Sequence, residues 1–189
     1  HHLQLNYTHS FSESLAWSTT FNYTRGDGYY ENYKAGKSFS KYLMQNPVID
    51  GIEYDEGDFI TREALANDYF VLNSDVRYVS DRLRLTGGIS LSRYDGDHIG
   101  KVLWNDVLGD GYDYASDNWY LNNGLKSEAN AFVRGEVLCC EGLTAFADLQ
   151  YRGVWLNMSG PENDGVLLDH KDNWHFFNPR AGLSYRWSP

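Results

Sequence analysis

An all-β chain, built as an antiparallel up-and-down meander of about seven long strands, is predicted by three features of the sequence. Apolar and polar residues alternate with a period of two in several stretches, which is the period of a strand with one apolar and one polar face. The connections between these stretches are either very short or very long. Aromatic residues make up 16% of the 189 residues and prolines number only 4, a composition that excludes a disordered chain.

The first two strands form the first predicted hairpin. In residues 3–11 the odd positions are mostly apolar or aromatic and the even positions are small and polar. After a break at 12–14 the alternation resumes in residues 15–24, with Leu15, Trp17, Phe21 and Tyr23 again at odd positions. Two such runs around a short break predict an antiparallel pair with one apolar face.

Two further hairpins and a last strand follow the same rule. The second hairpin turns at Ser80 and Asp81, and the third turns around Glu141. The last strand alternates from residue 175 to Trp187. The seven predicted strands are residues 3–11, 15–24, 68–79, 82–94, 127–138, 142–154 and 175–187.

Three long connections, residues 25–67, 95–126 and 155–174, are predicted to be loops on one rim. The formal net charge is −10, and most of the acidic residues lie in these connections. Strand charges such as Arg84 and Asp148 fall nearly all on the polar face. A charge facing lipid at mid-bilayer costs about 2–4 kcal/mol, whereas one facing water costs little. This pattern predicts a membrane β-barrel with lipid on the apolar face, water on the polar face and long extracellular loops.

Composition also excludes other classes of protein. No apolar run approaches the roughly 20 residues of a membrane helix, and the acidic balance argues against nucleic acid as a partner. A soluble β-sandwich remains the structural alternative. Its strands average nearer five or six residues, and loops as long as 25–67 are unusual in compact soluble domains.

The sequence contains no motif for catalysis or for a cofactor. No GxSxG, HExxH, P-loop or CxxC motif is present, so we expect neither an enzyme nor a bound cofactor. Asp95, Asp97 and His98 resemble a set of metal ligands, but a turn with solvated acids is the favoured interpretation and no metal site is predicted. Cys139 and Cys140 are adjacent, and two unpaired thiols at a turn are expected because a bond between neighbours would be strained.

The long loops hold the candidate ligand-binding residues. Their aromatic rings offer stacking faces, and their carboxylates and imidazole offer hydrogen-bond partners for a sugar or a metal chelate. The alternative is that these aromatic side chains only pack on one another. The candidates are Tyr29, Tyr30, Tyr33, Asp95, Asp97, His98, Trp104, Tyr112, Trp119 and Tyr120.

Four segments of the chain carry a resemblance to a known family. They are RGDGYYENYKAG (Arg25–Gly36), SRYDGDHIGKVLW (Ser92–Trp104), LTAFADLQYRG (Leu143–Gly153) and FFNPRAGLSYRW (Phe176–Trp187). In this order, and with the intervening strands, they resemble the barrel of TonB-dependent outer-membrane receptors, the energised importers of Gram-negative bacteria. Each segment is moderately specific, and the four in sequence cover most of the chain.

This resemblance implies that residues 1–189 are a partial barrel, a fragment of a 22-stranded transmembrane β-barrel in the bacterial outer membrane. The implied function is import of a scarce nutrient (siderophore-iron, haem, cobalamin or a glycan) with energy from the inner membrane. The implied partners are outer-membrane lipid, a plug domain and the remaining strands of the same parent chain, a TonB-type energy transducer, and a small nutrient ligand. We expect the plug and the transducer-binding segment to lie outside this chain, which by itself could transport nothing.

Two other functions stay open at this point. One is a soluble all-β binding or adhesion module that uses the aromatic, acidic loops. The other is a porin-like barrel that is not energised.

Overall fold

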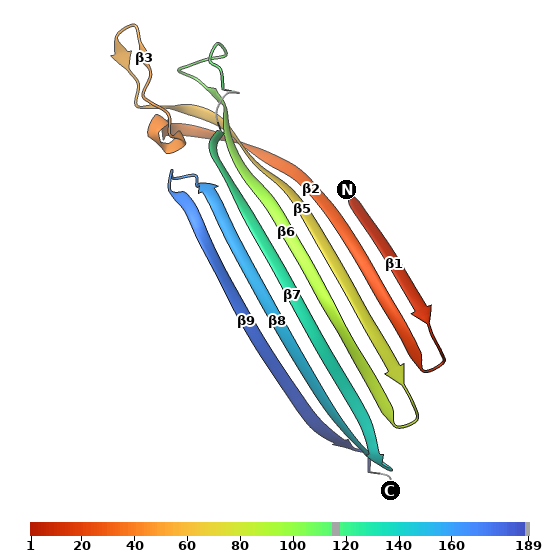
Figure 1. Cartoon of the computed structure of the whole chain (residues 1–189). Coiled ribbons are helices and arrows are strands. Elements are labelled where there is room, and N and C mark those ends of the chain that lie inside the picture. The colour runs from red at the N-terminus through yellow and green to blue at the C-terminus, as the bar shows by residue number, and fades with distance from the viewer. Residues whose placement is uncertain (115–117, 188–189) are drawn as a thin grey trace.

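Seven long strands form a single antiparallel sheet in the computed structural model, which describes residues 1–114 and 118–187 (Figure 1). The order across the sheet is β1-β2-β5-β6-β7-β8-β9, so consecutive long strands are neighbours, as in a meander. The long strands are β1 (His2–Ser10), β2 (Leu15–Ser38), β5 (Glu56–Val79), β6 (Leu83–Asn105), β7 (Asn118–Cys140), β8 (Leu143–Pro161) and β9 (Leu167–Tyr185). The predicted all-β meander of seven strands is confirmed.

The predicted strand ends at the loop rim are wrong. Strand β2 continues to Ser38 rather than ending at residue 24, and β5 begins at Glu56 rather than at residue 68. Most of the predicted loops 25–67, 95–126 and 155–174 is therefore strand. Polar, aromatic and aliphatic side chains are mixed on both faces of these extensions, so the alternation fades there, but the backbone ladder between strands continues.

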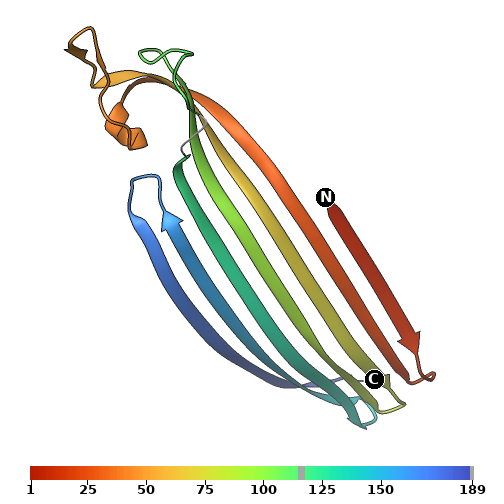
Figure 2. The same cartoon turned by 45° about the horizontal axis from the view of Figure 1, so that its top comes forward.

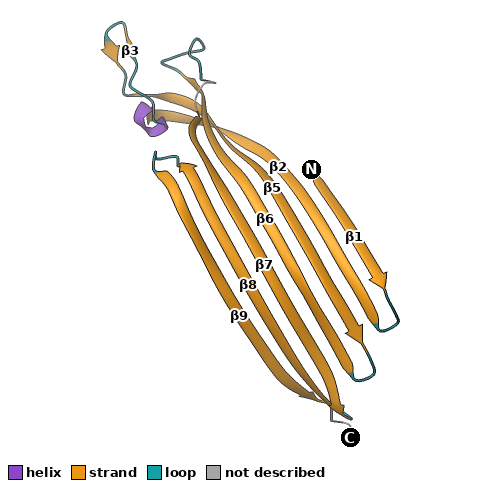
Figure 3. Ribbon diagram, in the orientation of Figure 1, coloured by secondary structure: helices purple, strands orange, loops and turns teal. Residues whose placement is uncertain are grey.

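Short connections remain where long loops were expected (Figure 3). The longest follows β2 and holds a 3-10 helix, η1 (Phe39–Tyr42), and a small hairpin of β3 (Val48–Ile49) and β4 (Ile52–Glu53). Strands β8 and β9 are joined by only residues 162–166. Among the described residues, no helix has the length and apolar character needed to cross a membrane.

The pairing register brings the apolar side chains of all seven strands to one face. Leu5 pairs with Phe21, which pairs with Leu72, which pairs with Leu91. Because side chains alternate across a strand, every second residue from these positions shares the same face. We call this the outer face; it includes Leu15, Tyr78, Ile89, Val133, Leu149 and Leu183. The opposite, inner face includes Arg84, Ser90, Arg134, Asp148 and Arg180.

No second layer of described residues covers the outer face. Ile89, Val133 and Leu149 lie in the middle of the sheet and are nevertheless 42–44% exposed. The accessible surface is 12836 Å², whereas a compact monomer of 21.7 kDa has roughly 9,200 Å². The core of a soluble sandwich is absent from the described residues.

The buried core lies at the loop end instead. Phe39 and Tyr42 of η1 pack against Phe59 and Val102, and all four are less than 7% exposed. The ring centroids of Phe39 and Phe59 are 5.1 Å apart in an edge-on contact. Figure 2 shows the sheet bending toward the side on which η1 lies. Phe59 belongs to the inner face by register, so the inner face is the concave one.

Each hairpin is displaced along the sheet relative to the one before it. Tyr78 pairs with Leu15 and also with Leu85, which lies two residues past the start of β6. Val137 pairs with Leu83 and also with Ala145, two residues past the start of β8. The sheet is therefore staggered by one residue per strand.

Glycines on the inner face make room for aromatic rings of the neighbouring strand. A Cβ at Gly88 would lie 2.9 Å from Phe132 Cε1 and 2.7 Å from the carbonyl oxygen of Ser74. The second of these atoms is backbone and cannot move aside without distorting β5. A Cβ at Gly135, on the outer face, would meet only Leu85 Cδ1 at 3.6 Å.

We expect Gly88→Ala to lower the free energy of unfolding by about 1–3 kcal/mol, because the added methyl overpacks the inner face. Gly135→Ala is the matched control and should cause no loss. The measurement is urea unfolding of the intact protein in detergent micelles. Equal losses in the two variants would show that the close packing at Gly88 does not constrain the sheet.

Candidate functional site

A cavity of about 610 Å³ lies at the loop end of the sheet, across β2, β5, β6 and β7. Its volume is in the range of about 300–1,000 Å³ that small-molecule sites have. Most of its side chains project from the inner face by register. Its lining residues are Gly26, Asp27, Gly28, Tyr29, Tyr30, Glu63, Ala64, Leu65, Asn67, His98 and Tyr120.

Glycines open the cavity. Gly26 and Gly28 of β2 line the cavity and occupy neighbouring inner-face positions. A Cβ at Gly28 would meet no atom within 4 Å. Side chains of neighbouring strands lie over two other inner-face glycines: Asn67 Oδ1 would be 2.4 Å from a Cβ at Gly26, and the Tyr120 ring would be 2.1 Å from a Cβ at Gly100 of β6. The missing side chains create the hollow, and the neighbouring aromatic rings form its walls.

Tyr30 and Glu63 face each other across the β2–β5 pair. The Tyr30 hydroxyl donates to Glu63 Oε2 at 2.5 Å. This hydrogen bond raises the pKa of Tyr30, because the carboxylate accepts the proton that ionisation would remove. Glu63 thus places a carboxylate in the cavity with one of its two oxygens already used.

His98 is oriented by Asn122 of β7. His98 Nδ1 lies 3.0 Å from Asn122 Oδ1, and Asn122 Nδ2 donates to the carbonyl oxygen of Pro161 at 3.4 Å. Because the amide nitrogen is the donor to Pro161, the amide oxygen accepts from His98, which assigns the imidazole proton to Nδ1. Nε2 is then a hydrogen-bond acceptor on a ring that lines the cavity.

Tyr120 forms the buried end of the cavity. It is 8% exposed, and its ring packs edge-on against Trp119 with the ring centroids 4.8 Å apart. Burial, with a smaller effect from the Glu63 carboxylate, raises the pKa of Tyr120 to about 12. The phenol is therefore neutral at physiological pH and can act as a donor or an acceptor.

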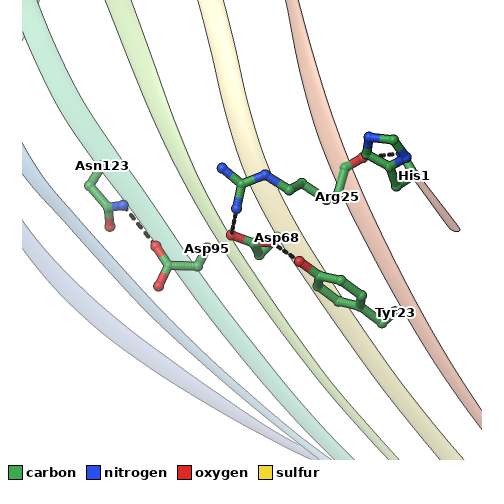
Figure 4. A network of polar contacts seen from close by, with 6 residues as sticks. All are labelled: His1, Tyr23, Arg25, Asp68, Asp95 and Asn123. Atoms are coloured by element: carbon green, nitrogen blue, oxygen red, sulfur yellow. Dashed lines mark hydrogen bonds and ion pairs between the residues drawn. The ribbon is translucent and has the colours of Figure 1, made fainter. Parts of the chain in front are cut away.

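The outer face at the same height carries a separate polar network (Figure 4). The Tyr23 hydroxyl donates to Asp68 Oδ1 at 2.5 Å, and the Arg25 guanidinium lies 3.4 Å from Asp68 Oδ2. Asn123 Nδ2 donates to Asp95 and to Asp97, both at 2.8 Å. Tyr23 belongs to the last row of the apolar outer-face band, and the charged groups and Asn123 lie one to two rows beyond it.

The structure divides the predicted ligand residues among several places. Tyr30, His98 and Tyr120 line the inner-face cavity together. Tyr29 borders it, but its ring lies under the Arg62 guanidinium, 4.2 Å from its centroid. Asp95 and Asp97 lie on the outer face, opposite His98, because successive strand residues point to opposite faces.

The turn predicted at residues 95–98 is wrong, because these residues lie within β6. Among residues 1–114 and 118–187, no three His, Cys, Asp or Glu side chains are grouped so that they could hold a metal ion.

The remaining candidates lie near the loops. Tyr33 donates a hydrogen bond to Asp58, and Trp104 Nε1 donates to Asp110 at 3.1 Å. Tyr112 and Trp119 line a second cavity of about 580 Å³ beside η1. These four residues do not line the inner-face cavity.

Sequence reasoning missed two polar residues of the cavity lining, Glu63 and Asn67, and also Asn122, which orients His98. Glu63 and Asn67 lie in a segment that was predicted to be a loop, so no partner strand could be assigned to them. The register of β2 with β5 was the missing signal, because it places Glu63 opposite Tyr30 and Asn67 opposite Gly26.

Comparison with protein-family models finds no matching family, and comparison with curated proteins finds no matching relative.

We expect the stability of the protein above pH 10 to depend on Tyr120. The folded state keeps the Tyr120 proton up to about pH 12, whereas the unfolded chain loses it near pH 10, so the free energy of unfolding falls as the pH rises between these values. Tyr120→Phe should remove up to about 3 kcal/mol of this fall. The measurement is urea unfolding from pH 9 to 12, with pH 7 as the internal control. Parallel curves for the two proteins would contradict the assignment.

Proposed function

We propose that this chain is part of the barrel of an outer-membrane receptor of the TonB-dependent kind, which imports a scarce nutrient across the bacterial outer membrane. The outer face contacts lipid, and the inner face lines an aqueous path. The complete receptor would also contain a plug domain and further strands, and would act with an energy transducer. The ligand is a small nutrient molecule that enters from the loop end.

The observation that carries this proposal is the uncovered apolar outer face. Side chains such as Leu85, Ile89 and Leu149 are at least 40% exposed on a sheet with no second layer of described residues. A soluble binding module would have to hide such a surface, since exposed apolar patches of this extent promote aggregation. In a membrane, lipid hydrocarbon would cover this apolar surface instead.

The apolar band has the height of a bilayer core. On β2 it runs from Leu15 to Tyr23, about 27 Å along the strand. With the strands tilted by about 35°, this becomes roughly 22 Å along the barrel axis, against about 25 Å for the apolar band of outer-membrane barrels.

Aromatic residues and then charges mark the upper boundary of the band. Tyr23 stacks on Phe70 with the ring centroids 4.7 Å apart, and one outer-face position further Arg25 pairs with Asp68. Near the opposite edge of the sheet, on the same outer face, Tyr151 and Trp155 of β8 contact the His175 ring of β9. Amphipathic rings between apolar and charged rows suit a membrane interface.

Polar groups inside the band are satisfied within the protein. The Trp17 indole nitrogen donates to Ser74 Oγ at 2.8 Å, and the Thr19 hydroxyl donates to the carbonyl oxygen of Asn73 at 3.0 Å. Internal partners are needed here, because hydrocarbon offers no hydrogen bonds.

The stagger of the sheet supports a barrel. One residue per strand combines a rise of about 3.4 Å with a strand spacing of about 4.8 Å, which gives a strand tilt of about 35°. Outer-membrane barrels have tilts of about 35–45°. The outer edges of β1 and β9 have no partner among the described residues, and we propose that further strands of the parent chain pair with them, because open edges promote aggregation.

Ion pairs on the inner face fit a water-filled interior. Glu128 pairs with Lys126 at 2.5 Å and with Arg152 at 2.7 Å. Asp148 pairs with Arg180 at 2.5 Å. These charges lie at the same height as the apolar side chains of the outer face. The inner face therefore suits water, and the outer face suits lipid hydrocarbon.

Site-directed labelling tests the proposal. After Cys139 and Cys140 are replaced by serine, single cysteines are placed at Leu85, Thr86, Ile89 and Ser90 of the intact protein and labelled with an environment-sensitive fluorophore in lipid vesicles. We expect a lipid-borne quencher to act on labels at 85 and 89, and aqueous iodide to act on labels at 86 and 90. Labels that respond alike at all four positions would contradict the proposal.

Charge insertion gives a second, independent expectation. Ile89→Arg places a cation in the middle of the apolar band and should cost about 2–4 kcal/mol of folding free energy in vesicles. Ser90→Arg, its neighbour on the inner face, should cost less than about 1 kcal/mol. Urea unfolding in vesicles measures both, and a larger cost at Ser90 would reverse the assignment of the faces.

A further inference from the structure

The charges around the inner-face cavity restrict the ligands that it can hold. Glu63 places a carboxylate in the lining, and none of the lining residues is a lysine or an arginine. The two tyrosines on its inner face are neutral at physiological pH, since the pKa of each is raised. The charge of the lining therefore disfavours anions, favours cations and does not act against neutral molecules.

Two free hydrogen-bonding atoms of the cavity, Glu63 Oε1 and His98 Nε2, are acceptors. Tyr30 uses Glu63 Oε2, which leaves Oε1 to accept from a ligand. His98 Nε2 is an acceptor because Asn122 holds the proton on Nδ1. A ligand that satisfies both atoms must carry several O–H or N–H donors.

The walls of the cavity suit a ring. Tyr30 and Tyr120 offer aromatic surface, and Leu65 adds apolar surface. At Gly28 the absence of a side chain leaves space next to the backbone of β2. Flat aromatic walls and a few fixed polar atoms are the usual composition of a site for a ring-shaped small molecule.

We propose that this cavity binds a neutral or cationic sugar ring, with its hydroxyl or amino groups donating to Glu63 and His98, and that it rejects anionic ligands. This inference rests on the proposed function, because it names the chemical class of the imported molecule from the residues that line the cavity.

Three trisaccharide probes of similar size and different charge test the inference: triglucosamine (cationic), maltotriose (neutral) and trigalacturonate (anionic). Each is titrated into the intact protein in detergent micelles by calorimetry. We expect the affinity to decrease in the order triglucosamine, maltotriose, trigalacturonate, with no measurable binding of the last.

Two glycine variants locate the binding. Gly28→Leu adds a side chain to the cavity lining at a position where a Cβ meets nothing within 4 Å, and it should weaken binding by about tenfold or more. Gly124→Leu is the matched control: it lies on the inner face, its Cβ also meets nothing within 4 Å, and it does not line the cavity. It should change the dissociation constant by less than about twofold.

Glu63→Gln tests the charge. It should weaken triglucosamine binding by about tenfold, because a charge-assisted hydrogen bond is lost, and it should leave maltotriose binding within about threefold.

Three results would overturn the inference: trigalacturonate binding as tightly as triglucosamine, Gly28→Leu behaving like Gly124→Leu, or no binding of either the cationic or the neutral probe at millimolar concentrations. The labelling pattern on β6 separates these results from failure of the proposed function. If the labels alternate and the sugars fail, only the ligand class is wrong. If the labels do not alternate, the membrane proposal itself fails.

Discussion

The register of the backbone ladder is the constraint on which the rest of this structure depends. Side chains alternate across every strand, so a slip of one residue between two neighbours would move a whole strand of apolar side chains to the other face. The register shifts of the long sheet lie near its ends, at Lys34/Lys37, Ile60/Thr61, Gly100/Lys101 and Leu138/Cys140. Between them the pairing is unbroken, and the apolar outer face is continuous from β1 to β9.

The two faces of the sheet differ in polarity, as the proposed barrel wall requires. On the outer face, apolar residues end at Tyr23 and Phe70, and charged residues follow in the next row. On the inner face, ion pairs such as Asp148–Arg180 line the middle of the sheet, and the cavity around Tyr30 and His98 lies above them. The strands continue well past the apolar band, so the ladder that fixes the apolar outer-face side chains also positions the cavity.

The strands were predicted correctly where one face of the sheet is apolar and the other is polar. Only there do apolar and polar residues alternate with a period of two. The hairpin turns at Ser80 and Glu141 were found for the same reason. The extensions were missed because their two faces do not differ in polarity, so that Glu63 or Asn67 carries no periodic signal. His98 was grouped with Asp95 and Asp97 by proximity in sequence, and only the knowledge that β6 continues through them separates the faces. Four residues of the cavity lining, Tyr29, Tyr30, His98 and Tyr120, were predicted as ligand-binding residues of the long loops, but their meeting point required the register.

Polarised infrared spectroscopy of the intact protein in oriented bilayers tests the central claim most directly. Amide I dichroism reports the angle between the strands and the membrane normal. A sheet staggered by one residue per strand, with lipid against its outer face, should give a tilt of about 35–45° and should stay in the bilayer after washing with high salt. Strands lying parallel to the membrane plane, or protein that remains in the aqueous phase as a monodisperse monomer, would contradict the assignment of lipid to the outer face.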